Sequence, residues 1–242
     1  MRYGVLSDIH ANLEALSAVL AALKKEAVNE YVCAGDIIGY GADPDACVGA
    51  VKKLRASSIL GNHDAVCAGR ISLDAFTQYA KDALVWTDAH MTEESRDYLK
   101  GLKYRHDEEG VFTAVHGTLS GPELFGYMFT RREAQESFEL LENNLLFIGH
   151  THVPGVFEES RGRVTFSGRN RINMRRGSRY IVNTGSVGQP RYGNPAACFA
   201  VFDSDAMTVE IQRTDYDVAT AQKKIIGAGL PAILAERLGS GV

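Results

Sequence analysis

Residues 3–10 read YGVLSDIH, an apolar run that passes directly into an aspartate and a histidine. Residues 3–6 are typical of a short buried strand, and apolar residues then repeat at helical spacing over residues 13–23. The alternation continues with a strand at 31–34, a helix from about Asp45 and a strand at 58–60. Because strands that alternate with helices favour crossover connections, we predict a largely parallel sheet with both faces buried.

The rest of the chain is predicted to add helices and a second sheet. Residues 72–102 contain two predicted helices, which we interpret as a helical insertion, and buried strands return at 111–115 and 145–148. A capping box at Thr130 begins the helix between those two strands. Beyond Pro154 we expect a meander in a second sheet, with strands at 163–166, 180–182, 198–202 and 208–211. Residues after Asp217 are predicted to be helical, and since no linker divides the chain, we expect a single domain over residues 1–242.

The composition excludes several classes of protein. Lys and Arg number 26 against 30 Asp and Glu, so the net charge is −4 and the chain is not a globally basic nucleic-acid binder. No apolar run approaches the roughly 20 residues of a membrane span, and no signal peptide is evident. The four cysteines form no CxxC pair, which argues against a disulfide framework or a thiolate zinc site. We therefore expect a cytoplasmic protein with no membrane partner.

Five successive predicted strands each end in aspartate, asparagine or histidine. In parallel α/β sheets, ligands bind at the carboxyl ends of the strands, so we expect these side chains to converge on one site. Helix caps and turns account for one or two such residues, but not for the paired histidines. The residues are Asp8 and His10, Asp36, Asn62 and His63, His116, and His150 and His152.

This set offers oxygen and imidazole ligands and no cysteine. Such a set suits Mn²⁺, Fe, Zn²⁺ or Ni²⁺, and it is too rich in imidazole for a Ca²⁺ or Mg²⁺ site. Seven candidate ligands exceed the need of one transition ion, and a carboxylate such as Asp36 can bridge two. Two ions about 3.5–4 Å apart would clamp a phosphate and lower the pKa of a bridging water.

In chain order, these residues resemble the motif set of the calcineurin-like metallophosphoesterases. The motifs are Asp8-x-His10, Gly35-Asp36, Gly61-Asn62-His63-Asp64, His116 and Gly149-His150-x-His152, and together they are far more specific than any one alone. The resemblance implies an α/β fold, an αββα four-layer sandwich of two mixed β-sheets. The segments at 183–186 and 188–191 point to a bacterial and archaeal branch of small phosphodiesterases.

The resemblance also implies a role for each motif residue. One metal would be held by Asp8, His10, Asp36 and His152, and a second by Asp36, Asn62, His116 and His150, with Asp36 bridging. His63 would be the catalytic histidine, which binds no metal, faces the substrate and assists the leaving group. The cofactors would be two divalent transition metal ions; we favour Mn²⁺, with Fe, Zn or Ni as alternatives.

The implied reaction is hydrolysis of a phosphodiester or phosphoanhydride bond by a metal-bridging hydroxide, in a small phosphorylated or nucleotide substrate. Phosphoprotein phosphatases of this superfamily have Asp and Arg shortly after the Gly-Asp motif, where residues 37–41 here read IIGYG. A protein phosphatase is therefore not expected, and Asp64 is the candidate to orient His63. Two alternatives stay open: a non-catalytic metal-binding scaffold with the same fold, and a nuclease. No oligomeric state is predicted.

Two further features bear on the substrate. Arg191 lies in a turn rich in Gly and Pro, where its planar guanidinium could bind phosphate, and Asn12 is a helix cap that could contact substrate. Residues 161–179 contain seven arginines and no acidic residue. This arginine-rich segment could attract polyanions, but aromatic residues are sparse in it, so we favour a solvated hairpin.

Overall fold

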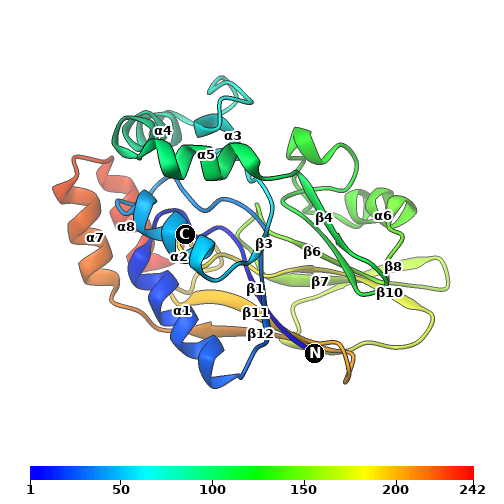
Figure 1. The fold of residues 1–242 in the computed structure, drawn as a ribbon. Coiled ribbons are helices and arrows are strands. Elements are labelled where there is room, and N and C mark those ends of the chain that lie inside the picture. The colour runs from blue at the N-terminus through cyan, green and yellow to red at the C-terminus, as the bar shows by residue number, and fades with distance from the viewer.

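Two six-stranded mixed β-sheets pack face to face in the computed structural model, which describes residues 1–242 (Figure 1). The first sheet has the order β3-β2-β1-β11-β12-β9, and the second has the order β4-β5-β6-β10-β7-β8. The strands of the first sheet are β1 (Arg2–Leu6), β2 (Glu30–Cys33), β3 (Ser57–Ser58), β9 (Arg171–Asn173), β11 (Ala197–Asp203) and β12 (Thr208–Thr214). Those of the second are β4 (Arg105–Glu108), β5 (Phe112–Val115), β6 (Leu145–Ile148), β7 (Gly155–Ser160), β8 (Arg163–Ser167) and β10 (Ser178–Asn183).

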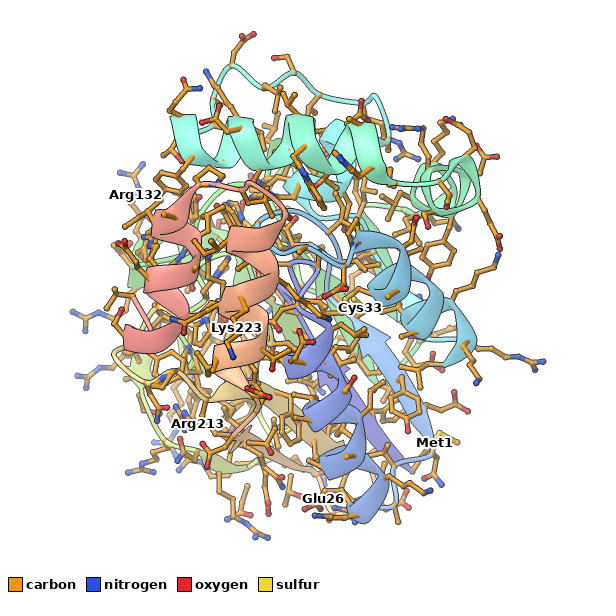
Figure 2. The ribbon with its side chains drawn as sticks, turned by 90° about the vertical axis from the view of Figure 1, so that its left-hand side faces the viewer. Met1, Glu26, Cys33, Arg132, Arg213 and Lys223 are labelled. Atoms are coloured by element: carbon orange, nitrogen blue, oxygen red, sulfur yellow. The ribbon has the colours of Figure 1, made fainter.

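Helices cover the outer faces of both sheets. Figure 2 shows α1, α7 and α8 side by side in front of the first sheet, with α2 next to them and α4 across the top. Helix α6 packs on β7 and β8 of the second sheet. The helices are α1 (Leu13–Lys25), α2 (Pro44–Lys53), α3 (Asn62–Cys67), α4 (Gln78–His90), α5 (Glu93–Gly101), α6 (Arg131–Leu140), α7 (Val218–Gly227) and α8 (Ala232–Ser240). No helix combines the length and the apolar character needed to cross a membrane.

Strand β1 contributes side chains to two apolar layers, one between the two sheets and one between the first sheet and its helices. Tyr3 and Val5 face the second sheet, where Tyr3 packs edge-on against Phe112 with ring centres 5.2 Å apart. Leu6 faces the helices instead, as the period-2 alternation of a strand requires. Gly4 also faces the helices, and a methyl group there would lie 2.9 Å from a methyl carbon of Leu23 in α1. The absence of a side chain at residue 4 therefore lets α1 pack closely on the sheet.

The αββα arrangement of two mixed sheets is confirmed, but the predicted meander is wrong. Strands β11 and β12 belong to the first sheet, where β11 pairs antiparallel with β1 and Ala200 is opposite Val5. Phe199 and Val201 face the helices, whereas Phe202 faces the second sheet. Both faces of β11 are therefore apolar, which fits a central strand covered on both sides. The first sheet is consequently mixed, and not largely parallel as predicted.

Other expectations differ from the structure only in detail. Helices α4 and α5 occupy the predicted insertion at 72–102, and α6 begins directly after the predicted cap Thr130. Strands β4, β7 and β9 were not predicted, and β4 and β9 are short edge strands that carry charged residues. The organisation as a single domain stays a prediction.

Candidate metal centre

The predicted ligands come from both sheets and meet at one edge of the sandwich. Asp8 follows β1 and Asp36 follows β2 in the first sheet, whereas His116 and His150 follow β5 and β6 in the second. The backbone N–H of His150 donates to both carboxylate oxygens of Asp8, at 3.0 and 3.2 Å, and so links the two sheets. The sequence therefore predicts the convergence correctly, although the five strands belong to two sheets and not to one.

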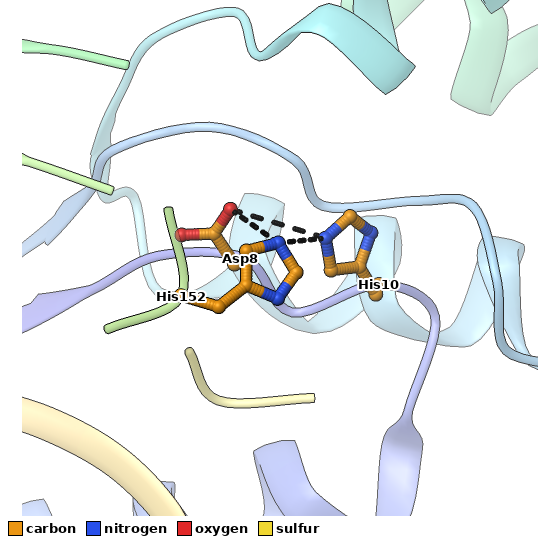
Figure 3. A group of neighbouring side chains, drawn as sticks. All are labelled: Asp8, His10 and His152. Atoms are coloured by element: carbon orange, nitrogen blue, oxygen red, sulfur yellow. Dashed lines mark hydrogen bonds and ion pairs between the residues drawn. The ribbon is translucent and has the colours of Figure 1, made fainter. Parts of the chain in front are cut away.

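Asp8, His10 and His152 form the first group of candidate ligands (Figure 3). The Nε2 atoms of the two imidazoles lie 3.1 Å apart, and a carboxylate oxygen of Asp8 lies 3.3 Å from Nε2 of His152. The Nδ1 atoms face the backbone carbonyls of Ile38 and Gln189, at 3.2 and 2.5 Å. Because a neutral imidazole that donates from Nδ1 has a lone pair on Nε2, the two Nε2 atoms direct lone pairs at each other. A cation between them relieves that repulsion, so these residues fit a metal ion.

Asp36, His116 and His150 form the second group. The Nε2 atom of His116 lies 3.3 Å from the Asp36 carboxylate and 3.2 Å from Oδ1 of Asn62, while its Nδ1 faces the Ala34 carbonyl at 2.7 Å. Asn62 thus lies beside this second group, as the sequence predicts.

Asp36 lies between the two groups. The same carboxylate oxygen, Oδ2, is 3.3 Å from Nε2 of His116 and 3.6 Å from Nε2 of His10. Its other oxygen accepts a 2.8 Å hydrogen bond from the backbone N–H of His63. One oxygen therefore faces both candidate metal positions, while the other holds the start of α3.

The backbone at the site is strained. Five of the seven predicted ligands have positive φ angles between 49° and 66°, a region that side chains other than glycine seldom occupy. The glycine before Asn62 allows a close approach, because a methyl group on Gly61 would overlap the Asp36 carboxylate. The surrounding structure therefore holds these ligands in a costly conformation that aims them at one point. The five strained ligands are Asp8, His10, Asp36, His150 and His152.

The electrostatics of the site favour a cation. Burial raises the pKa of both Asp8 and Asp36, but the neighbouring imidazoles outweigh this effect and hold both pKa values below the ordinary range. Burial alone would lower the pKa of His116, yet the carboxylates of Asp36 and Asp8 raise it to about 9. Burial lowers the pKa of His150 to about 3. At neutral pH the carboxylates are thus ionised, and His116 carries a proton in the position that a metal ion would take.

His63 lies at the edge of the cluster, and packing fixes its ring. Its ring centre is 4.5 Å from that of Tyr40 and 5.2 Å from that of Phe76, and its Nδ1 is buried with no hydrogen-bond partner. Asp64 does not orient it, contrary to our expectation. The Asp64 carboxylate instead accepts hydrogen bonds from the backbone N–H groups of Ile37, Ile38 and Gly61, at 2.9–3.2 Å.

The two predicted substrate-binding residues occupy different environments. Arg191 lies beside the cluster, where its guanidinium donates to the Tyr40 hydroxyl at 3.2 Å. Asn12 caps α1 by accepting from the N–H of Ala15 at 3.1 Å, and its amide donates to the carbonyl of Gly188 at 2.9 Å. The cap is confirmed, and substrate contact by Asn12 stays a prediction.

The arginine-rich segment, residues 161–179, lies at the edge strands β8 and β9. Arg171, Arg175 and Arg179 form ion pairs with Glu210, Glu158 and Glu159. Several of its arginines line a hollow that contains none of the candidate metal ligands. The segment therefore lies away from the candidate metal centre, as the favoured prediction expects, but it is not a hairpin, because β8 pairs with β7 whereas β9 pairs with β12 of the other sheet.

Two tyrosines at the site were missed as functional candidates. Tyr40 has a left-handed φ of 61° and its ring centre lies 4.5 Å from that of His10. Its position within the IIGYG segment, directly after a predicted ligand, was the available signal. Tyr127 stacks on His150 with ring centres 3.9 Å apart, and no pattern in its loop indicated that contact.

Three comparisons with known proteins agree with this geometry. The profile of the Calcineurin-like phosphoesterase superfamily domain matches residues 1–207. The crystal structure of a metallophosphoesterase from Sphaerobacter thermophilus superposes with a TM-score of 0.89 at 40% identity, covering 100% of this chain and 99% of that one. Among curated sequences, MJ0912 of Methanocaldococcus jannaschii is 37% identical over 97% of this chain and 96% of its own length. The phosphodiesterase YfcE of Escherichia coli is 25% identical over 86% and 91% of the two chains.

The shared position of Asp36 predicts how metal content responds to substitution. After saturation with Mn²⁺ and removal of free metal, we expect elemental analysis to find about two ions per chain. Asp36→Ala should lower the occupancy of both positions, whereas Asn62→Ala should mainly affect one. His90→Ala, which removes an exposed histidine outside the cluster, is the matched control and should retain both ions. At most one ion in the parent protein would contradict a dinuclear centre.

The protonation of His116 predicts a pH dependence of metal binding. Because its pKa is about 9 in the metal-free protein, metal must displace a proton at any pH below that value. We expect calorimetry in buffers of different ionisation enthalpy to show at least one proton released at pH 7, from His116, and a second where a metal-bound water ionises. Affinity should rise by at least about tenfold per pH unit between pH 6.5 and 8. An affinity independent of pH over this range would mean that His116 is already deprotonated.

Proposed function

This chain belongs to the calcineurin-like phosphoesterase superfamily, and from that premise we propose that it is a dinuclear metal-dependent phosphodiesterase. Its substrate would be a small phosphorylated compound or a nucleotide. The observation that carries the proposal is the position of Oδ2 of Asp36 between the two groups of candidate ligands. This oxygen lies 3.6 Å from Nε2 of His10 and 3.3 Å from Nε2 of His116.

The candidate ligands divide into two sets that share Asp36. Asp8, His10 and His152 would hold one ion, and His116, His150 and Asn62 the other. When bound, the two ions would supply Lewis acidity to the phosphoryl oxygens and a water made nucleophilic at neutral pH. The Nδ1 atoms of His10 and His152 face backbone carbonyls, so these two neutral imidazoles are already in the tautomer that binds metal through Nε2. His116 reaches the same tautomer once its Nε2 proton is displaced.

His63 is the proposed proton donor to the leaving oxygen. It lines the cavity that opens beside the cluster, and its ring is held between Tyr40 and Phe76. Burial lowers its pKa to about 4 in the metal-free protein, although the Asp36 carboxylate acts in the opposite direction. A bound phosphate would add negative charge beside the ring, and nearby negative charge favours the protonated imidazole.

Arg191 is the proposed phosphate-binding residue from this chain. Its Nε is buried without a hydrogen-bond partner, and its guanidinium is held through the Tyr40 hydroxyl. The planar guanidinium can donate two parallel hydrogen bonds to a phosphate.

The proposed bond type and setting rest on further observations. A phosphodiester substrate is supported by the similarity to the phosphodiesterase YfcE. It is also supported by the IIGYG segment, which lacks the Asp and Arg of the superfamily's phosphoprotein phosphatases. We propose Mn²⁺ as the metal because the ligands combine carboxylate, amide and imidazole. A cytoplasmic setting is supported by four buried cysteines that are all free.

Substitution of His63 tests the proposed reaction through the leaving group. An alkoxide or ribose oxygen needs a proton as its bond to phosphorus breaks, whereas nitrophenolate leaves readily without one. We expect the Mn²⁺-loaded parent to hydrolyse both a nitrophenyl and a nucleoside phosphodiester. His63→Ala should lose about 10²–10⁴-fold in kcat on the nucleoside ester and much less on the nitrophenyl ester.

Metal content measured in the same samples makes this test interpretable. His63→Ala should keep its ions, whereas His150→Ala should not. Equal losses on both esters would mean that His63 is not the proton donor, and lost metal in His63→Ala would make it a ligand. Absence of hydrolysis by the parent on every phosphodiester tried, with two ions bound, would contradict the proposed function and favour a scaffold.

A further inference from the structure

A cavity of about 330 Å³ opens beside the candidate metal centre. Asn62, His63 and His150 contribute to its wall, so anything held in it lies next to the cluster. The remaining wall comes from residues 71–80, which end in the first turn of α4, from residues 124–127, and from Tyr40 and Arg191. Its volume is at the lower end of the range for small-molecule sites, about 300–1,000 Å³, and is suited to one compact group.

Aromatic rings dominate this cavity. Five of its fourteen lining residues are Phe or Tyr, among them Phe76 and Tyr79 from the helical insertion. On the loop after β5, Tyr127 stacks on His150 at an interplanar angle of 16°, and Phe129 stacks on Tyr127 with ring centres 5.3 Å apart. Tyr127 and Phe129 are 49% and 66% exposed. Large aromatic faces left in contact with water beside a reactive centre are typical of a site that a flat ligand covers.

The cavity has one cation and no carboxylate. Arg191 is the only Lys or Arg in its wall, and no Asp or Glu lines it, although the chain as a whole carries a net charge of −4. The guanidinium carbon lies 5.8 Å from the centre of the Tyr40 ring, and Nε has no partner. The wall thus combines flat apolar surfaces with a single group suited to a phosphate.

We propose that this cavity binds the nucleoside of the substrate, with the base against Tyr79 and the exposed part of Tyr127 and an attached phosphate at Arg191. The proposal rests on the proposed function, because it takes the metal cluster as the place where the phosphate reacts. Aromatic faces bind bases of any sequence by stacking, as in single-strand nucleic-acid sites. The hydroxyls of Tyr40, Tyr79 and Thr77 in the same wall favour a base and a sugar over an acyl chain.

Equilibrium binding of two matched ligands tests the proposal without catalysis. Adenosine 5′-monophosphate and ribose 5-phosphate carry the same sugar phosphate, and only the first carries a base. Calorimetric titration of the Mn²⁺-loaded protein should show that adenosine 5′-monophosphate binds about tenfold or more tightly, which is the range expected for a stacked base.

The position of the bound base can be found by replacing tyrosines of the cavity wall with leucine. Leucine keeps an apolar side chain of similar bulk but has no flat ring on which a base can stack. Tyr79→Leu and Tyr127→Leu should each reduce the preference for adenosine 5′-monophosphate about fivefold or more. Tyr79→Leu should also leave ribose 5-phosphate binding unchanged. Tyr127→Phe, which retains the ring, should keep the parent preference. Phe166→Ala is the control, because this ring is 54% exposed but lies outside the cavity.

The outcomes separate this inference from the proposed function. Equal affinity for the two ligands in the parent would overturn the nucleoside site and leave the phosphate site intact. A preference that survives both leucine variants would also overturn it, because the base would then bind elsewhere. Failure of the metal-loaded parent to bind either ligand would contradict the proposed function together with this inference.

Discussion

The carboxylates of Asp8 and Asp36 are fully buried, and the arrangement of the site follows from the cost of burying them. An ionised carboxylate away from water is very unfavourable unless cations or hydrogen-bond donors surround it. Here imidazoles from both sheets surround the pair, and backbone N–H groups of His63 and His150 donate to them. Strained backbone at five ligands aims these groups inward, and the closeness of Gly61 to Asp36 leaves no room for a side chain. Two buried negative charges so arranged are better suited to metal ions than to protons alone.

Because the carboxylates come from one sheet and most of the imidazoles from the other, the site depends on how the sheets meet. Hydrogen bonds tie the loops together there: the N–H of Gly188 and the hydroxyl of Ser186 both donate to the Asp8 carbonyl, at 2.9 and 2.8 Å. Both donors follow β10 of the second sheet, whereas Asp8 follows β1 of the first. A displacement of one sheet would therefore separate the two halves of each candidate ligand set. The aromatic core between the sheets, including Tyr3, Phe112 and Phe147, fixes the position of one sheet relative to the other.

The features that the sequence predicts well are local ones. An apolar run followed by Asp8 and His10 marks the end of a strand whatever that strand pairs with, so the candidate ligands could be chosen from residue types and spacing. The sheet to which each strand belongs could not be predicted in this way, because the pairing of β11 with β1 joins residues about 200 positions apart. The aromatic stack of Tyr127 on His150 also depends on a loop whose path no pattern indicates. For Asp64, the motif spacing could not distinguish a carboxylate that orients His63 from one that accepts three backbone N–H bonds.

His63 could in geometry be either a proton donor or a metal ligand. Side-chain atoms of His10, Asp36 and His63 also lie close enough together to hold an ion. Anomalous diffraction at the manganese edge, from crystals grown with Mn²⁺, tests the central claim most directly. The account predicts two peaks about 3.5–4 Å apart with Asp36 between them. One peak should be bound by His10 and His152, the other by His116 and His150, and neither by His63. A single peak, or a peak bound by His63, would contradict it.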